Sequence, residues 1–479
     1  MKNVLKNKEK VYTRLNVKTK YYAVIVALVL ILPFLFRLNS PLPGDENYLI
    51  DRLSHTISEN RNLYDDLSFG GMPITRPLGT ILLFSLFNRF RDIAFVLLPI
   101  ICGILSVILF VKILNKLNIS KDIIFVSFFI LVLSNAFLYN FTIFNFYTIP
   151  VVLILLGFYL VIQNRIYGSF IIFSVMPFFG FFNFITGFFL FVFYLIYKKE
   201  KRTLFIYLLS VLITGFTAFF WQIRSYGFPS LAFNNFAAFL QNILTEFNGF
   251  GVGLPIFILG LIGLKKLWEK KYDNIISYLF LIFLFVLTYL NTRLVIYLSF
   301  LLSYLAAVGL IHIYNIKWES LDTKKITIFI MILSILFSGF SYIVKFKAIS
   351  PTEEMNDALL YLKENTDEES VIFSHYNNGM LISSIAFRKN FIDKSFTYIP
   401  GIKKRLNDQE NLFYSRNLKR SSSILDRYDV QYILITKDMK HGLVWNDENE
   451  GLLFVLKFSE NFIKVYDKND IEIWRYFPE

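Results

Sequence analysis

Long apolar runs separated by short charged connections dominate residues 1–344. A helix needs roughly 20 residues to cross a bilayer, and runs near that length recur at 21–38, 93–114, 122–139, 147–162, 167–182, 184–197, 203–221, 252–264, 275–290, 294–313 and 326–344. This pattern predicts about eleven transmembrane helices. The short runs within 167–197 and at 252–264 leave the count open by one or two.

Residues 345–479 have the mixed pattern of an α/β domain. Helices are predicted at 351–364 and 422–428, strands at 371–373 and 430–435, and a terminal hairpin at 462–466 and 471–476. No catalytic constellation is visible in this pattern, and we expect it to serve acceptor recognition or a structural role. The predicted fold class is therefore an α-helical polytopic membrane domain, residues 1–344, followed by a soluble α/β domain, residues 345–479.

The charged connections predict an orientation. With the N-terminus cytoplasmic, the inner connections carry 22 Lys and Arg and the outer ones carry eight, as the positive-inside rule requires. An odd number of spans then places residues 345–479 outside. We expect a multi-pass protein of the cell membrane with an extracytoplasmic C-terminal domain.

Composition narrows the class of partner. The net charge is +13 and 55% of the 479 residues are hydrophobic, but the basic residues punctuate apolar runs instead of forming one solvated face, which excludes nucleic acid as a partner. A single cysteine excludes a disulfide framework and a thiolate metal cluster. All eight outer basic residues are Arg. They either pair with outer acids or recognise phosphate, to which the guanidinium fork is suited.

The first outer loop, residues 39–92, is the most patterned connection. It predicts an amphipathic helix on the membrane surface, with one face formed by Leu49, Ile50, Leu53 and Ile57 and the opposite face by Asp51, His55 and Glu59. Asp45 and Glu46 stand at its N-terminal end. They are either functional acids or simply an N-cap and a first-turn acid that complement the helix dipole. Farther along, Gly70, Gly71 and Pro73 predict a tight, ordered turn, which Asp65 and Asp66 could initiate.

The order of these motifs resembles a known superfamily. Gly-Asp-Glu-x-Tyr at 44–48, Tyr-Asp-x-Leu-Ser-x-Gly-Gly-x-Pro at 64–73 and Pro-Leu-Gly at 77–79 look like the polytopic glycosyltransferases of the GT-C superfamily, which include protein mannosyltransferases and oligosaccharyltransferase catalytic subunits. The resemblance implies a lipid-phosphate-linked sugar donor, a catalytic acid in the first outer loop and a soluble domain after the last span. The mannosyltransferase-like register makes Asp45 the catalytic acid. The oligosaccharyltransferase-like register, acid-x-Tyr-x-x-x-Arg, fits Glu46 with Arg52 instead.

Two family features are missing from this chain. The second outer loop, near 139–147, has no acid where metal-dependent members carry one, and no Trp-Trp-Asp-x-Gly sequence occurs in the C-terminal domain. A divalent metal is possible on the resemblance, but no second acidic loop supports it. No other cofactor is predicted.

Sugar transfer from a polyprenyl phosphate needs a base near the acceptor hydroxyl and cations at the departing phosphate. Partial desolvation of a loop acid is expected to raise its pKa toward working pH. Arg293 is the leading candidate for the phosphate, because it lies between two apolar runs at the outer surface, where a charge is costly and often functional. The alternative is an interfacial anchor that snorkels into the headgroups. The resemblance favours the functional role, because in family members an Arg at the outer start of a late span binds donor phosphate. Arg224 and Arg52 are weaker candidates for binding that phosphate.

The leading hypothesis is thus a glycosyltransferase with a polyprenyl-phosphate-linked sugar as donor and a protein, glycan or lipid as acceptor. The rival classes are a transporter or flippase of a lipid-linked saccharide and a non-catalytic membrane scaffold. Ion-coupled transporters place acids near the bilayer midplane, whereas in this chain only Asp122, at the very start of a run, lies within a predicted span. That distribution favours the enzyme.

Overall fold

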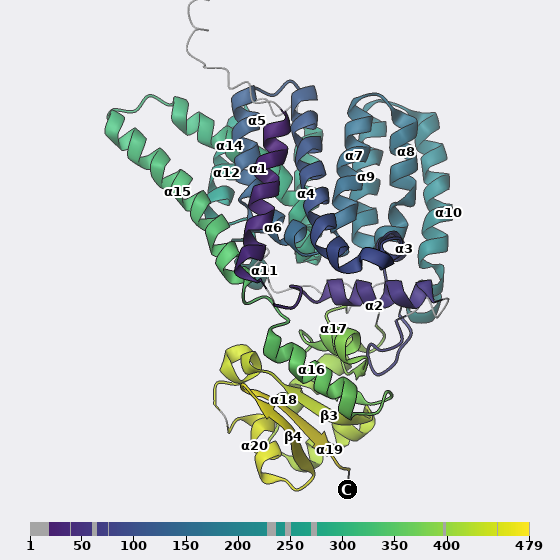
Figure 1. Cartoon of the computed structure of the whole chain (residues 1–479). Coiled ribbons are helices and arrows are strands. Elements are labelled where there is room, and N and C mark those ends of the chain that lie inside the picture. The colour runs from purple at the N-terminus through teal and green to yellow at the C-terminus, as the bar shows by residue number, and fades with distance from the viewer. Residues whose placement is uncertain are drawn as a thin grey trace, which may run out of the picture.

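A bundle of helices stands on a smaller α/β domain, and α2 (Glu46–Ser58) lies across the end of the bundle between the two (Figure 1). The computed structural model describes residues 19–38, 40–59, 65–74, 76–227, 236–244, 251–269, 275–395, 399–447 and 449–478. The other elements of the first part are α1 (Thr19–Ile31), η1 (Leu32–Phe36), α3 (Leu78–Ser85), η2 (Asn88–Phe90), α4 (Arg91–Lys116), α5 (Lys121–Val132), α6 (Asn135–Thr142), α7 (Thr148–Ile162), α8 (Ile166–Val175), η3 (Met176–Phe179), α9 (Phe181–Tyr197), α10 (Lys201–Tyr226), α11 (Phe236–Leu244), α12 (Leu254–Trp268), α13 (Ile275–Leu290), η5 (Thr292–Leu294), α14 (Val295–Asn315) and α15 (Leu321–Phe346).

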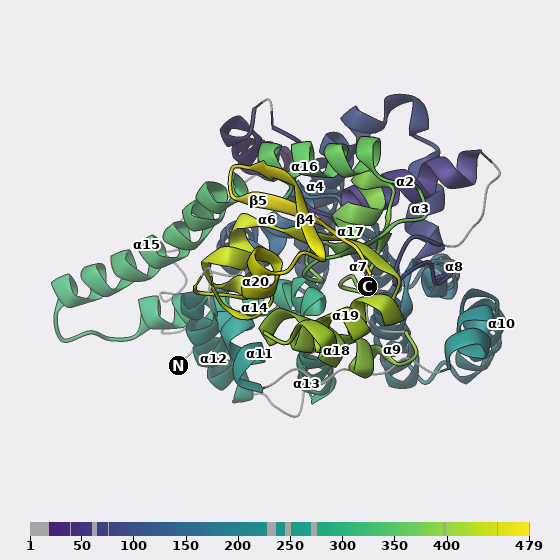
Figure 2. The ribbon, with the colours of Figure 1, turned by 90° about the horizontal axis from the view of Figure 1, so that it is seen from below.

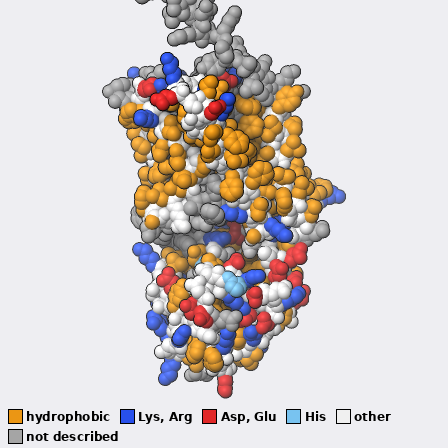
Figure 3. Space-filling model, turned by 90° about the vertical axis from the view of Figure 1, so that its left-hand side faces the viewer, with side chains coloured by type: hydrophobic (Ala, Val, Ile, Leu, Met, Phe, Trp, Pro, Cys, Tyr) orange, Lys and Arg blue, Asp and Glu red, His pale blue; other side chains and the backbone are white. Residues whose placement is uncertain are grey.

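Helices occupy all the apolar ranges predicted as spans, but most are short. Four are long and apolar enough to cross a membrane, namely Asn88–Lys116, Lys201–Phe220, Thr292–Asn315 and Leu321–Phe346, and the bent pair α5–α6 makes a fifth if it is one span. The total of eleven spans therefore stays a prediction. Figure 3 shows an apolar band across one face of the bundle, with charged side chains gathered above it and over the lower domain, as expected for a protein that exposes apolar helices to lipid.

The apolar run predicted as a span at 122–139 forms two helices instead of one. α5 and α6 are bent by 62° at a short break. Ser134 lies in that break, where its hydroxyl donates to the Leu131 carbonyl at 2.7 Å and accepts from the Phe137 N–H at 3.4 Å. One side chain thus ends the first helix and caps the second, and the bend gives α6 its own direction.

Close helix packing fixes α14 in the middle of the bundle. A Cβ atom on Gly309 would lie 2.1 Å from the Leu259 carbonyl oxygen, and one on Gly263 would lie 1.9 Å from the Leu305 oxygen. Only glycine permits α12 and α14 to approach this closely. Arg293 lies in η5, directly before α14. The close packing of α12 and α14 therefore helps to fix its position.

The amphipathic helix predicted in the first outer loop is confirmed as α2. Leu49, Ile50 and Leu53 are buried against α3, α4 and Phe144. On the opposite face His55 and Glu59 stay exposed, at 54% and 40%. α17 (Gly379–Leu381) and η6 (Ile382–Ala386) of the C-terminal domain also pack on α2. The helix is clamped between two domains.

The C-terminal domain is a five-stranded mixed sheet with helices around it. Its other elements are α16 (Glu353–Asn365), β1 (Val371–Phe373), β2 (Lys389–Asn390), α18 (Ile402–Tyr414), α19 (Leu418–Arg427), β3 (Val430–Ile435), η8 (Met439–Leu443), α20 (Gly451–Phe458), β4 (Phe462–Lys468) and β5 (Ile471–Tyr476). The strand order is β2-β1-β3-β5-β4, with β2, β1 and β3 parallel and β5 antiparallel to β3 and β4. Seen from below, the domain covers the end of the bundle while α15 extends to one side (Figure 2).

Candidate active site

Asp45 occupies the N-cap position of α2, but its side chain makes no capping hydrogen bond. The predicted N-cap position is therefore confirmed, but the carboxylate itself makes no bond to the helix end. Gly44 sets its position: its φ is +94°, and its N–H donates to the Ser350 carbonyl at 2.6 Å. A Cβ atom there would lie 2.5 Å from Ile143 Cγ2, so the turn before Asp45 requires glycine.

The Asp45 carboxylate faces a lysine of the C-terminal domain. Lys394 Nζ lies 2.6 Å from Asp45 Oδ2, and the Asp45 side chain is only 7% exposed. Burial opposes ionisation of Asp45, but the Lys394 ammonium and the Arg293 guanidinium outweigh it and hold the pKa below its ordinary value. The expectation that desolvation raises the pKa of this acid toward working pH is thus wrong for Asp45. The group is ionised at neutral pH.

Glu46 pairs with a different cation. Its Oε1 lies 3.1 Å from Arg293 Nη2, and its Oε2 accepts the Phe146 N–H at 3.1 Å. Both side chains are largely buried, at 9% exposed for Glu46 and 19% for Arg293. The structure therefore brings together three of the predicted residues, Asp45, Glu46 and Arg293. The two neighbouring acids each hold one cation.

Aromatic hydroxyls of the second outer connection complete the surroundings of Arg293. Its Nη1 donates to the Tyr139 hydroxyl at 3.2 Å, and its guanidinium carbon lies 5.4 Å from the centre of the Tyr139 ring. The Asn291 side chain accepts the Arg293 backbone N–H at 3.0 Å and donates to the Tyr147 hydroxyl at 3.0 Å. These contacts fix the direction of the guanidinium before any ligand arrives.

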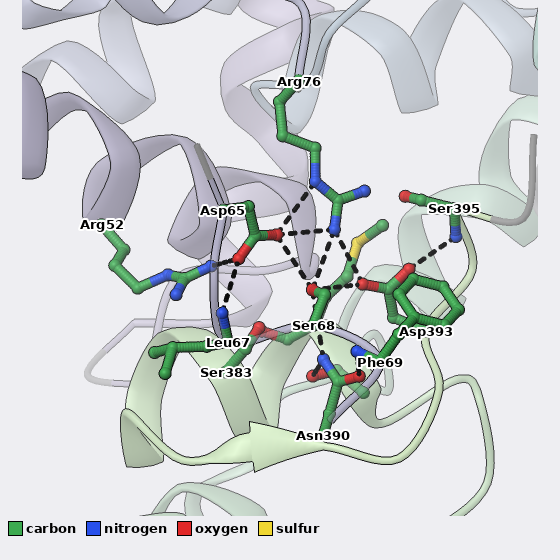
Figure 4. Close-up of polar contacts among 12 residues, drawn as sticks. Arg52, Asp65, Leu67, Ser68, Phe69, Arg76, Ser383, Asn390, Asp393 and Ser395 are labelled. Atoms are coloured by element: carbon green, nitrogen blue, oxygen red, sulfur yellow. Dashed lines mark hydrogen bonds and ion pairs between the residues drawn. The ribbon is translucent and has the colours of Figure 1, made fainter. Parts of the chain in front are cut away.

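Arg52 lies in a second cluster, built around Asp65 (Figure 4). Asp65 is fully buried, and it accepts from Arg52 Nη2 at 2.6 Å and from Arg76 Nη2 at 2.7 Å. Burial opposes its ionisation, yet the two guanidinium groups hold its pKa far below the ordinary value. Within the described residues no contact links Arg52 to Asp45 or Glu46, so its role at a donor phosphate stays a prediction.

The same cluster fastens the loop to the C-terminal domain. Arg76 Nη2 also lies 2.8 Å from Asp393 Oδ2, and the Ser68 hydroxyl lies 2.9 Å from Asp65 and 2.8 Å from Asp393 (Figure 4). Asn390 accepts the Phe69 N–H on its side chain at 3.1 Å. Lys394 follows Asp393 directly in the chain. The contacts of Asp393 with Arg76 and Ser68 therefore place the lysine beside Asp45.

Arg224 is not brought to these residues. It lies exposed in the last turn of α10, and α10 packs mainly on α8, α9 and η3. In the described ranges no contact joins it to Asp45, Glu46 or Arg293. Its role as a second phosphate ligand also stays a prediction.

The residues present do not fit a divalent metal. Over the part of the chain that the structure describes, no three His, Cys, Asp or Glu side chains come close enough together to hold one. At Asp45 a lysine ammonium contacts the carboxylate, and the second outer connection presents Tyr139 and Tyr147, which are poor ligands for Mg²⁺ or Mn²⁺.

Sequence reasoning missed Lys394, Arg76 and Asp393. Asp65 accepts the Leu67 N–H at 3.3 Å, as a turn-initiating acid does, and it also pairs with Arg52 and Arg76. An acid before a Gly-Gly turn with Arg76 close behind it is a usable signal for such a buried pair. The turn itself is confirmed, since Gly71 N–H and Met72 N–H both donate to the Ser68 carbonyl. No local motif marks Asp393 or Lys394.

Comparison with known proteins identifies the fold. No protein-family model matches the chain, and neither does any curated protein. Among solved structures, archaeal oligosaccharyltransferase AglB from Archaeoglobus fulgidus, in complex with an inhibitory peptide and a dolichol-phosphate, is 12% identical with a TM-score of 0.54 over 96% of this chain and 74% of that one. ArnT from Cupriavidus metallidurans bound to undecaprenyl phosphate is 10% identical, with a TM-score of 0.52 over 96% and 98%.

A third structure, arabinofuranosyltransferase AftD from Mycobacteria, is 14% identical, with a TM-score of 0.56 over 96% of this chain and 42% of that one. At these identities the likeness shows the fold alone. The chain has the GT-C fold, and the resemblance inferred from its loop motifs is confirmed at that level.

Proposed function

We propose that this chain is a membrane glycosyltransferase that transfers a sugar from a polyprenyl-phosphate donor to an acceptor at the end of the bundle that carries the C-terminal domain, which the charge pattern places outside the cytoplasm. The fold supports glycosyl transfer in general, because the neighbours named above are glycosyltransferases, one with dolichol-phosphate and one with undecaprenyl phosphate. The observation that carries the proposal is the grouping of Asp45, Glu46 and Arg293 at the junction of the two domains.

Asp45 is the base in this proposal. Its carboxylate is ionised at neutral pH and takes the proton of the acceptor hydroxyl as that oxygen bonds to the anomeric carbon. Lys394 engages Oδ2, so we assign the proton to Oδ1. The bond between the anomeric carbon and the phosphate oxygen breaks, and its electron pair leaves with the polyprenyl phosphate.

Arg293 receives that departing charge. Two of its nitrogens already contact Glu46 and Tyr139, which hold the guanidinium in place without reorganisation during the reaction. Glu46 is the positioning residue for Arg293 in this scheme, which favours Asp45 over Glu46 as the base. The C-terminal domain, packed over α2, is the surface assigned to the acceptor, whether protein, glycan or lipid.

The test uses purified full-length protein and polyprenyl phosphates carrying labelled sugars. Wild-type protein is expected to release or transfer the label, whereas Asp45→Asn reduces the rate at least 100-fold. Asp51→Asn, on the same helix but paired with half-exposed Arg91 at 3.6 Å, is the matched control and keeps the wild-type rate. Release or transfer that survives both Asp45→Asn and Glu46→Gln contradicts the catalytic assignment.

A further inference from the structure

The charges around Asp45 balance without any added ion. Two carboxylates, Asp45 and Glu46, face two cations, Lys394 and Arg293, each within 3.1 Å of its partner. A divalent metal beside Asp45 would have to displace or approach the Lys394 ammonium, which like charge opposes. The carboxylate that would be its first ligand is therefore already neutralised by the protein.

The lysine is held there by the fold. Asp393, its neighbour in the chain, is fully buried and paired with Arg76 at 2.8 Å, and its other oxygen accepts the Ser395 N–H at 2.7 Å. Residues on both sides of Lys394 are thus fixed to the first outer loop or to each other. Because the backbone on both sides of Lys394 is held in this way, its ammonium acts as a fixed charge. A lysine on an open surface would not.

Resting on the proposed function, we propose that Lys394 supplies, from the C-terminal domain, the fixed positive charge at the Asp45 carboxylate that a divalent metal would otherwise supply, and that sugar transfer by this chain is independent of divalent cations. Lys394 acts through Asp45 and is a positioning residue. Docking of the C-terminal domain through Arg76 and Asp393 is then a condition for activity.

A binding measurement tests this without knowledge of the donor. Purified wild-type protein is titrated with Mn²⁺ and followed by electron paramagnetic resonance, beside Asp45→Asn. The proposal predicts equal Mn²⁺ binding by the two proteins. A Mn²⁺ site in the wild type that Asp45→Asn removes overturns it, and this result is independent of whether any transfer activity is found.

Activity gives the second readout. Transfer is expected to change less than twofold between excess EDTA and millimolar Mg²⁺ or Mn²⁺. Lys394→Ala lowers turnover at least tenfold, Lys394→Arg retains most of it, and Lys389→Ala, a nearby lysine paired with exposed Glu369, leaves it unchanged. Transfer abolished by EDTA and restored by metal contradicts the proposal. Failure to find transfer with any donor counts against the proposed function instead.

The pH profile separates an electrostatic role from a merely structural one. The charged and titratable groups around Asp45 in the described residues are Lys394, Arg293, Glu46 and Tyr139. The Lys394 charge also acts on His375. Removing the ammonium in Lys394→Ala moves the acid limb of the turnover profile to higher pH. An equal loss of rate at every pH would mean that Lys394 serves only to hold the domains together, and would overturn the proposal.

Discussion

Lys394 and Asp45 are 349 residues apart in the sequence, yet their side chains meet at 2.6 Å. The contact joins the C-terminal domain to the motif that begins α2. It makes the candidate site a property of two domains, since the acid comes from the membrane part and its counter-charge from the soluble part. Disturbing the junction should therefore disturb the chemistry.

Loss of Arg76 should loosen that junction. Arg76→Met leaves buried Asp65 without one partner and removes the guanidinium that pairs with buried Asp393. Breaking a buried pair costs about 3–5 kcal/mol. Thermal unfolding in detergent should show the loss. Arg91→Ala removes the half-exposed pair with Asp51 and should cost less than about 1 kcal/mol; similar shifts for the two variants would contradict the structural role of Arg76.

Gly44 should not tolerate a side chain. Gly44→Ala combines a φ of +94° with a Cβ only 2.5 Å from Ile143 Cγ2, and we expect a loss of about 1–3 kcal/mol with displaced Asp45. Gly401→Ala is the control, because Gly401 also has a positive φ but its Cβ would meet nothing within 4 Å. Activity and melting temperature are measured for both variants. An equal effect of the two substitutions would show that backbone strain, and not the contact with Ile143, matters.

Arg293 should govern the affinity for the donor. Arg293→Ala is expected to weaken binding of a labelled polyprenyl-phosphate sugar at least tenfold, and Arg293→Lys to recover only part, because lysine lacks the planar fork of donors. Arg89→Ala, an exposed arginine on η2, is the control for general loss of positive charge. Arg224→Ala belongs in the same series. Unchanged donor affinity in Arg293→Ala would remove Arg293 from the site.

The C-terminal domain should lose stability as the pH falls from 6.5 to about 4. Burial, and then the Lys394 charge, lower the pKa of His375 to about 4. The unfolded chain, with an ordinary histidine pKa near 6.5, therefore binds more protons than the folded chain between pH 6.5 and 4. The free energy of unfolding is expected to fall by about 2 kcal/mol by pH 5. Unfolding of wild type and His375→Gln is compared between pH 7 and pH 4.5. If the free energy of unfolding of His375→Gln depended on pH as strongly as that of the wild type, His375 would not be the group responsible.

Much of the fold follows from local patterns. The apolar runs mark the helices of the bundle, and strands β1 and β3 coincide with short runs of mostly buried apolar residues. The two-residue strand β2 and the break at Ser134 were missed, because each depends on one or two hydrogen bonds and leaves little trace in the periodicity of the sequence. The α2 helix was predicted, but its packing against α17 and η6 was not, since those elements lie more than 300 positions away in the sequence.

The residues of the candidate site were also only partly predictable from the sequence. Asp45, Glu46 and Arg293 could be found because a short motif and an isolated charge between apolar runs are local signals. Lys394 is one of many lysines, and nothing around it in the sequence distinguishes it. Only the folded chain shows which lysine meets Asp45, and with it the lowered pKa of that acid, the opposite of what burial alone would give.

The central claim is that Asp45 is the base for sugar transfer, and single-turnover transfer by Asp45→Asn at saturating donor tests it most directly. Donor binding is measured on the same samples, so that a loss of rate is separated from a loss of affinity. The structure predicts donor binding within threefold of wild type and a rate at least 100-fold lower. A rate within tenfold of wild type, with donor bound, would contradict the role of Asp45.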